Sequence, residues 1–223
     1  ILEPYPCNGG VIPPADGFLE LARELTVASG AVLIFDEVIT GFRLGLGGAQ
    51  EMLGVTPDLT VVAKAMGNGF PVSAFGGRSE LMELVADNRV VHAGTYNGGG
   101  VSVAASLATI AELESAPVHA HLTELGMRLQ AGLVAAAEKH GKRLVTQGPG
   151  PVFFAWLLDE GEVRSFRDHR RADFAAYAAV AERMLDVGVR IIPAGRWYLS
   201  AAHTDDDIEA TIDAAERAFA PTW

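Results

Sequence analysis

Two continuous apolar runs, each followed by a charged side chain, are the sequence feature that most constrains the fold. Residues 31–35 (AVLIF) precede Asp36, and residues 59–63 (LTVVA) precede Lys64. Apolar runs without alternation are typical of parallel strands that are covered on both faces. Residues 16–29 carry apolar side chains at helical spacing, with Asp16 as the expected N-cap. This order predicts an α/β fold with a mostly parallel sheet and helices on both faces.

The remaining pattern changes character after residues 115–117 (SAP). Before this point we expect strands at residues 72–75 and 90–92 and helices at residues 79–85 and 101–114. After it we expect helices from about 118 to 139, at 172–186 and at 205–219, and strands at 143–146, 152–158, 189–192 and 198–201. We therefore expect two domains, residues 1–116 and residues 117–223, of which the second is a small α+β domain.

The composition excludes several classes of partner. A net charge of −11 argues against nucleic-acid binding, which needs clustered Lys and Arg on one surface. No apolar run has the length that a membrane span needs, so no membrane partner is expected. Cys7 is the single cysteine, which rules out an intrachain disulfide and makes a cytoplasmic location the default. The sequence opens at Ile1 inside an apolar stretch and without Met, so we expect a piece of a longer chain.

Asp36 and Lys64 are expected at the same edge of the sheet, because ligands of open α/β sheets bind at the carboxyl ends of the strands. A carboxylate and an amine placed together suit a cofactor whose ring nitrogen must stay protonated and whose carbonyl carbon forms a Schiff base. Each residue alone also has an ordinary interpretation. Lys64 could pack its stem on the sheet with its ammonium in water, and Asp36 could be a turn residue at a strand end.

A different class of enzyme shares part of this pattern. Four apolar residues followed by Asp36 and Glu37 resemble the Walker B strand of a P-loop-type nucleotide hydrolase. That function also needs a phosphate loop with Gly-Lys-Ser/Thr at its end. Gly141 and Lys142 are followed by Arg143, and Ala136 stands where the first glycine of the loop belongs. The hydrolase therefore remains an alternative that depends on residues outside this sequence.

Four motifs in order make the pattern more specific: FDEVITGFR at residues 35–43, TPDL at 56–59, KAMGNGFP at 64–71 and GTYNG at 94–98. Together they resemble the class III aminotransferases, which are fold-type-I enzymes that use pyridoxal 5′-phosphate (PLP). GFR at 41–43 and GGAQ at 47–50 are similar to the branch that contains glutamate-1-semialdehyde aminomutase, and YLSAAHT at 198–204 carries the resemblance in the C-terminal domain. The resemblance implies the second half of the large PLP-binding domain and a small C-terminal domain, so that only the C-terminal part of such an enzyme is present.

The resemblance also implies roles for individual residues. Lys64 would form the Schiff base with PLP and move a proton between the substrate carbon and the cofactor. Asp36 would pair with the ring nitrogen, and Val38 would support one face of the ring. Thr95 would bind the phosphate of the cofactor in a neighbouring subunit, which implies a homodimer with shared active sites. Glu3 resembles a family glutamate near the active site.

Some positions depart from the family pattern. Asn8 stands where many transaminases that use 2-oxoglutarate have a second glutamate, Ile39 replaces a glutamine, and residues 98–100 (GGG) replace Gly-Asn-Pro. Arg196 is a candidate for binding the substrate carboxylate. The family's phosphate-binding turn and its second ring-stacking residue precede Ile1. We expect PLP-dependent amino transfer between a small amino donor and a keto or aldehyde acceptor, by a class III transaminase. An aminomutase-type 1,2-transfer and a non-catalytic fragment are the alternatives.

Overall fold

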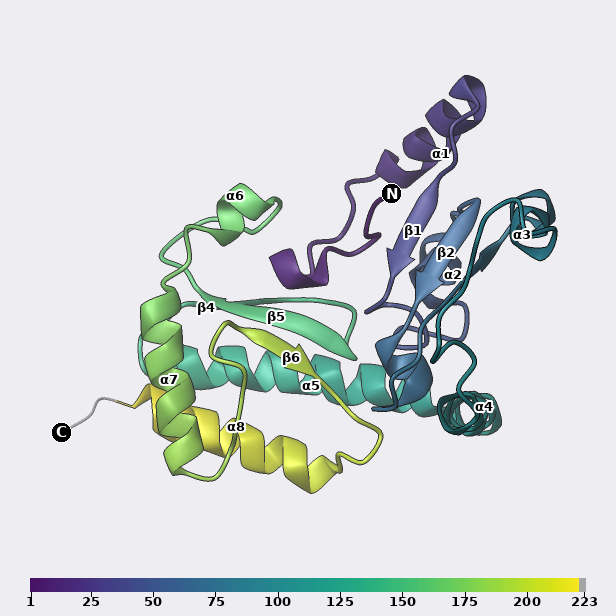
Figure 1. Cartoon of the computed structure of the whole chain (residues 1–223). Helices are drawn as coiled ribbons and strands as arrows, with labels where there is room; N and C mark the ends of the chain where they lie inside the picture. Colours follow the sequence, from purple (N-terminus) through teal and green to yellow (C-terminus); the bar gives the residue numbers. More distant parts are fainter. Residues whose placement is uncertain (221–223) are drawn as a thin grey trace. The chain divides into compact units, whose positions relative to one another are not determined.

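The computed structural model describes residues 1–220, and its contacts divide the chain into two compact units (Figure 1). The first unit contains Ile1–Tyr5 and Pro14–Pro117. The second contains Pro6–Pro13 and the chain from Val118 onward. The division therefore falls beside the proline at 117, and it assigns residues 6–13 to the second unit, which the sequence pattern did not predict.

The sheet of the first unit has the strand order β1-β2-β3, with β1 at Ile34–Glu37, β2 at Leu59–Val62 and β3 at Ala74–Gly77. β1 and β2 are parallel, as their continuous apolar sequences predict, whereas β3 runs antiparallel to β2. The helices of this unit are α1 (Phe18–Ser29), α2 (Gly48–Leu53), α3 (Ser79–Ala86) and α4 (Gly100–Ser115). A 3₁₀ turn, η2 (Lys64–Gly67), directly follows β2 and carries the candidate lysine.

Several predicted boundaries in the first unit are wrong. The strand expected from residue 31 begins at Ile34, because the Leu33 N–H donates to the Asp58 carboxylate at 2.7 Å and not to a neighbouring strand. The N-cap of α1 is Gly17 in the left-handed conformation (φ 75°), so Asp16 does not cap this helix. Residues 90–92 form no strand, and α2 was not predicted.

The second unit packs three long helices against an antiparallel sheet of order β4-β5-β6 (Figure 1). The strands are β4 (Leu144–Gln147), β5 (Val152–Leu157) and β6 (Arg196–Tyr198). The helices are α5 (Val118–Glu138), α7 (Phe174–Asp186) and α8 (Asp205–Phe219), with a short α6 (Phe166–His169) and the 3₁₀ turn η1 (Cys7–Gly9). Side chains from all three long helices and from all three strands form one hydrophobic core, so this unit matches the expected α+β arrangement.

The α8 boundaries are as predicted, because Thr204 and Asp207 form a reciprocal capping box at its start. Two strand predictions in this unit fail. Residues 189–192 are irregular, and the strand expected at 198–201 lies two residues earlier as β6. Trp197 of β6 lies opposite Phe153 of β5, and the two rings stack with 5.5 Å between their centroids. This cross-strand ring packing stabilises the observed register of β6.

Candidate active site

Three of the predicted site residues lie at the carboxyl ends of adjacent parallel segments in the first unit. Asp36 is the third residue of β1, and Lys64 follows the end of β2 by two residues. Leu2 pairs in parallel with Phe35 of β1, so the following residue, Glu3, lies at the same edge. The parallel topology, which brings together segments distant in sequence, therefore places two carboxylates and one amine at one edge of the sheet.

One oxygen of the Asp36 carboxylate is bound by a backbone N–H group, and the other oxygen has no hydrogen-bond donor in the described chain. Asp36 Oδ1 accepts a hydrogen bond of 3.1 Å from the Val38 N–H. Within residues 1–220 the structure gives its second oxygen, Oδ2, no protein donor. Asp36 and Val38 are both half-buried. A half-buried carboxylate with a fixed orientation and a free oxygen can accept a hydrogen bond from a protonated ring nitrogen, with the Val38 side chain beside it.

Lys64 has a strained backbone at the start of η2. Its φ angle is +44°, in the left-handed region that side chains with a Cβ rarely adopt, at a cost of about 1 kcal/mol. Its side chain is exposed, and its ammonium forms no ion pair with any carboxylate of residues 1–220. Strain of this kind is found where the surrounding structure holds a functional group in place. The Lys64 amine is therefore free to react. Its backbone departs from the extended conformation of β2.

Glu37, the neighbour of Asp36, has a different environment. It is fully buried, and its carboxylate accepts hydrogen bonds from Thr40 Oγ1 at 2.9 Å, from the backbone N–H groups of Ala49 and Gln50, and from the Gln50 side chain at 3.0 Å. These donors occupy the carboxylate on all sides. Glu37 is thus not placed to activate a nucleophile on a nucleotide phosphate, as the Walker B interpretation requires.

Thr95 lies in an exposed segment that precedes α4, and the structure shows no contact between it and Asp36 or Lys64. α4 itself packs beside η2. Its outer surface leaves large apolar side chains in solvent: Val101 is 72% exposed and Leu107 is 65% exposed. The structure therefore does not bring Thr95 into the site of its own chain.

Arg196, the candidate for binding a substrate carboxylate, meets Asn8, a departure from the family pattern, in the second unit. Arg196 is half-buried in β6, and its Nη1 donates a hydrogen bond to the Asn8 side-chain oxygen in η1. Arg196 also lines a cavity of about 230 Å³ together with Arg190 and His203. Because 188 residues separate the two partners, no local sequence signal could have found this pair.

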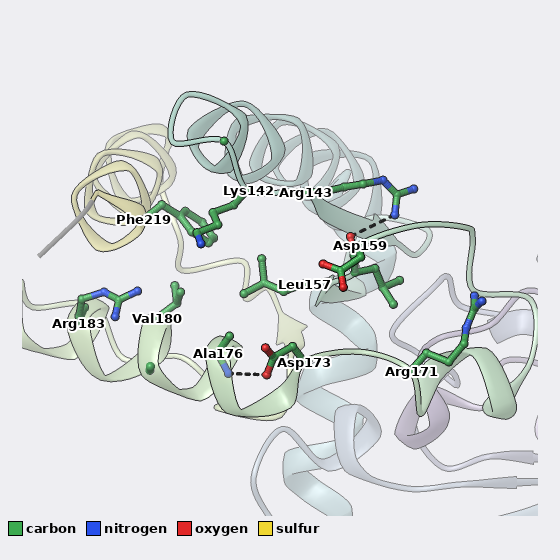
Figure 2. A pocket seen from close by; sticks show the side chains of 13 residues that line it. Lys142, Arg143, Leu157, Asp159, Arg171, Asp173, Ala176, Val180, Arg183 and Phe219 are labelled. Atoms are coloured by element: carbon green, nitrogen blue, oxygen red, sulfur yellow. Dashed lines mark hydrogen bonds between the residues drawn. The ribbon is translucent and has the colours of Figure 1, made fainter.

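A larger cavity of the second unit, of about 530 Å³, contains none of the predicted site residues (Figure 2). Arg143 and Arg183 line it, but backbone carbonyls hold both guanidinium groups. Arg143 donates to the Gly161 carbonyl at 2.7 Å, and Arg183 donates to the Ala218 carbonyl at 2.5 Å. Figure 2 shows their side chains on different walls, with the apolar side chains of Leu157 and Val180 between them.

Within residues 1–220, no group of three His, Cys, Asp or Glu side chains is arranged to hold a metal ion. No single helix of this part of the chain is long and apolar enough to cross a membrane.

Comparison with known proteins shows the family of this chain. Residues 1–219 match the family Aminotransferase class-III. The chain is 44% identical to glutamate-1-semialdehyde 2,1-aminomutase of Thermomicrobium roseum, over 99% of this chain and 52% of that protein. A second aminomutase, from Desulforudis audaxviator, is 43% identical over 98% of this chain and 51% of its own length. The chain thus spans about half the length of the curated relatives it matches.

Solved structures show the same fold. An omega-transaminase from Sphaerobacter thermophilus superposes with a TM-score of 0.89 at 34% identity, over 97% of this chain and 50% of that one. A beta-phenylalanine aminotransferase from Variovorax paradoxus superposes with a TM-score of 0.84 at 34% identity, over 96% of this chain and 50% of that one. The predicted α/β fold of the fold-type-I transferases is confirmed. The chain belongs to the class III aminotransferase family.

Proposed function

We propose that this chain takes part in PLP-dependent amino-group transfer, with Lys64 as the residue that binds the cofactor covalently. The observation that carries the proposal is the juxtaposition at the carboxyl ends of β1 and β2. There, Asp36 has an oriented carboxylate with a free oxygen, and Lys64 has an unpaired amine on a strained backbone. These are the two groups that PLP needs from a protein: a carboxylate for its ring nitrogen and an amine for its carbonyl carbon.

When bound, PLP would supply an electron sink for the carbanion that forms at the substrate carbon. The chain's own residues would do the remaining work. Asp36 Oδ2 would hold a proton on the ring nitrogen, while the Val38 N–H fixes the orientation of the other oxygen. The Val38 side chain would cover one face of the ring. The Lys64 Nζ would move a proton between the substrate carbon and the cofactor.

Transamination is the first candidate reaction and a 1,2-amino shift is the second. Arg196 favours transamination, since a guanidinium with further N–H groups beyond the one bonded to Asn8 can bind a substrate carboxylate. The aminomutase relatives favour the second. The two reactions differ in whether an oxo product leaves the enzyme. With PLP supplied, β-phenylalanine plus an oxo acid acceptor tests the first, and glutamate-1-semialdehyde without an acceptor tests the second.

A homodimer with Thr95 at the cofactor phosphate of the neighbouring subunit is part of the proposal. Its support is the exposed position of Thr95 and the apolar outer surface of α4, because a surface of this kind usually contacts a partner. Light scattering would give the mass in solution. A strictly monomeric protein would remove the shared site. We also propose a cytoplasmic location, for which the single cysteine is the support.

The direct test is reduction with borohydride in the presence of PLP, followed by peptide mapping. The chain contains only three lysines, so the label can be assigned without ambiguity. We expect the label on Lys64, a visible absorption band that bleaches on reduction, and loss of both in Lys64→Ala. Lys142→Ala is the matched control and should keep both. Equal labelling of all lysines, or unchanged absorption in Lys64→Ala, would sink the proposal in favour of a non-catalytic chain.

A further inference from the structure

On the face of the sheet opposite to Asp36, a buried carboxylate is bound entirely by donors of the first unit. Side chains alternate along a strand, so Glu37 points away from the face that carries Asp36. Glu37 is 0% exposed and receives four hydrogen bonds, from Thr40 Oγ1, Ala49 N, Gln50 N and Gln50 Nε2. Two of these donors are backbone N–H groups at the start of α2, so the carboxylate fixes that helix to the end of β1.

The Gln50 side chain extends this attachment to the neighbouring strand. Its Nε2 donates to Glu37 Oε1 at 3.0 Å and to Thr60 Oγ1 at 3.1 Å. Thr60 belongs to β2, where it lies opposite Phe35 of β1. The amide therefore joins Glu37, at the end of β1, to Thr60 of β2, four residues before Lys64. We call Glu37, Gln50 and Thr60 the strand clamp.

Close packing leaves little freedom around the strand clamp. A Cβ at Gly48, where φ is +66°, would overlap with Glu37 Oε2, and a Cβ at Gly41 would stand 2.7 Å from a methyl group of Val62. Both ends of the segment between β1 and α2 are consequently fixed. Val38 is part of this segment, and its N–H is the group that orients the Asp36 carboxylate.

We propose that the strand clamp positions Asp36 and Lys64 relative to each other for the cofactor, and this inference rests on the proposed function. A carboxylate is required at position 37, because all four partners of Glu37 are donors. Glutamine at this position would aim an NH₂ group at other N–H groups, and aspartate would be one methylene too short to reach them. Glu37, Gln50 and Thr60 touch neither cofactor nor substrate, so they are positioning residues.

Thr60→Val is the sharpest test, since it removes one hydrogen bond and keeps the shape and the β-branched character of the side chain. We expect its apparent PLP affinity, from the dose dependence of Lys64 labelling, to fall about fivefold, the effect of one lost hydrogen bond. The visible absorption of bound PLP should also change its pH dependence. Glu37→Gln should give a larger loss. Thr56→Val, at an exposed threonine without a side-chain hydrogen bond in the described chain, is the control and should match the parent.

The outcomes separate this inference from the proposed function. If the parent chain shows no selective Lys64 label, the proposed function fails, and the inference fails with it. If the parent is labelled and Thr60→Val has the same PLP affinity and the same pH profile, the proposed function stands and the strand clamp is only structural, even where urea unfolding shows reduced stability. Glu37→Gln can fail to fold, whereas the isosteric Thr60→Val keeps the test decisive.

Discussion

Asp58 is the charged group whose contribution to stability can be worked out most fully from the structure. It is almost completely buried in the first unit, just before β2. Its carboxylate accepts hydrogen bonds from Arg23 of α1 at 2.8 Å, from the Leu33 N–H at 2.7 Å and from Arg78 at 3.1 Å. Asp58 thus connects α1, the residue before β1 and the residue before α3 within the first unit.

These donors stabilise the charged form of the carboxylate. The hydrogen bond from Arg23 is the largest cause, and together the donors lower the pKa of Asp58 from 3.8 to about 2, although burial acts in the opposite direction. A difference of this size corresponds to roughly 2 kcal/mol of stability. Because the folded-state pKa lies below the unfolded one, this stability is fully present above pH 3.8 and is lost as the pH falls through about 2.

We predict that Asp58→Asn lowers the free energy of unfolding by about 2 kcal/mol or more at pH 7, since it leaves two guanidinium groups without their carboxylate. Urea unfolding followed by far-UV circular dichroism measures this loss of unfolding free energy. Tryptophan fluorescence would report unfolding of the second unit and not of the first, because Trp156 and Trp197 lie in the second unit. Asp16→Asn, at an exposed aspartate, is the control.

The pH dependence of the unfolding free energy tests the assignment of this stability to the charged Asp58 carboxylate. The difference in unfolding free energy between the parent and Asp58→Asn should shrink by about 2 kcal/mol between pH 5 and pH 2. Other carboxylates titrate in the same range, but they titrate in both proteins and cancel in the difference. A difference that stays constant over this range would refute the assignment of the charge to this carboxylate.

Three further substitutions test other parts of the structure by urea unfolding. Lys64→Gly should be more stable than Lys64→Ala by about 0.5–1 kcal/mol, because glycine adopts the left-handed φ of this position without strain; equal stability would contradict the strain. Tyr177→Phe should cost about 1–3 kcal/mol, because it leaves the Trp197 Nε1–H, now 2.7 Å from the Tyr177 oxygen, buried without an acceptor. Gly126→Ala in α5 should destabilise by more than about 1 kcal/mol, because the new Cβ would overlap with the Gly150 carbonyl oxygen; helix propensity alone predicts stabilisation, so the sign decides.

The sequence predicted those elements whose signal is local. The predicted α8 boundaries agree with a capping box at its start, and the parallel pair β1 and β2 followed from two uninterrupted apolar runs. The antiparallel direction of β3 could not be predicted, since direction depends on the path of the chain between strands. Residues 90–92 have the β-branched composition of a strand but no hydrogen-bonding partner strand in the described chain, so propensity alone was misleading.

The candidate site shows the same division. Asp36 and Lys64 became candidates because each follows an apolar strand and each belongs to a motif. The pairing of Arg196 with Asn8 and the bridge from Gln50 to Thr60 depend on tertiary proximity, which no spacing in the sequence encodes. The sequence pattern also allowed Glu37 a catalytic alternative, because of its neighbour and its strand; only its four donors assign it a structural environment.

Asp36 and Glu37, adjacent at the end of one strand, therefore have different environments, because successive side chains of a strand point to opposite faces. Asp36 keeps an oxygen free on the face of the candidate site, whereas Glu37 is saturated on the other face. If the two carboxylates exchanged faces, the carboxylate with the free oxygen would be buried without a hydrogen-bond donor. The N–H groups at the start of α2 would lose their acceptor. The double substitution Asp36→Glu with Glu37→Asp would lose the hydrogen bonds to α2, because the shorter side chain at position 37 could not reach this helix. The order of the two residues follows from the alternation of the strand together with the distance that each carboxylate must span.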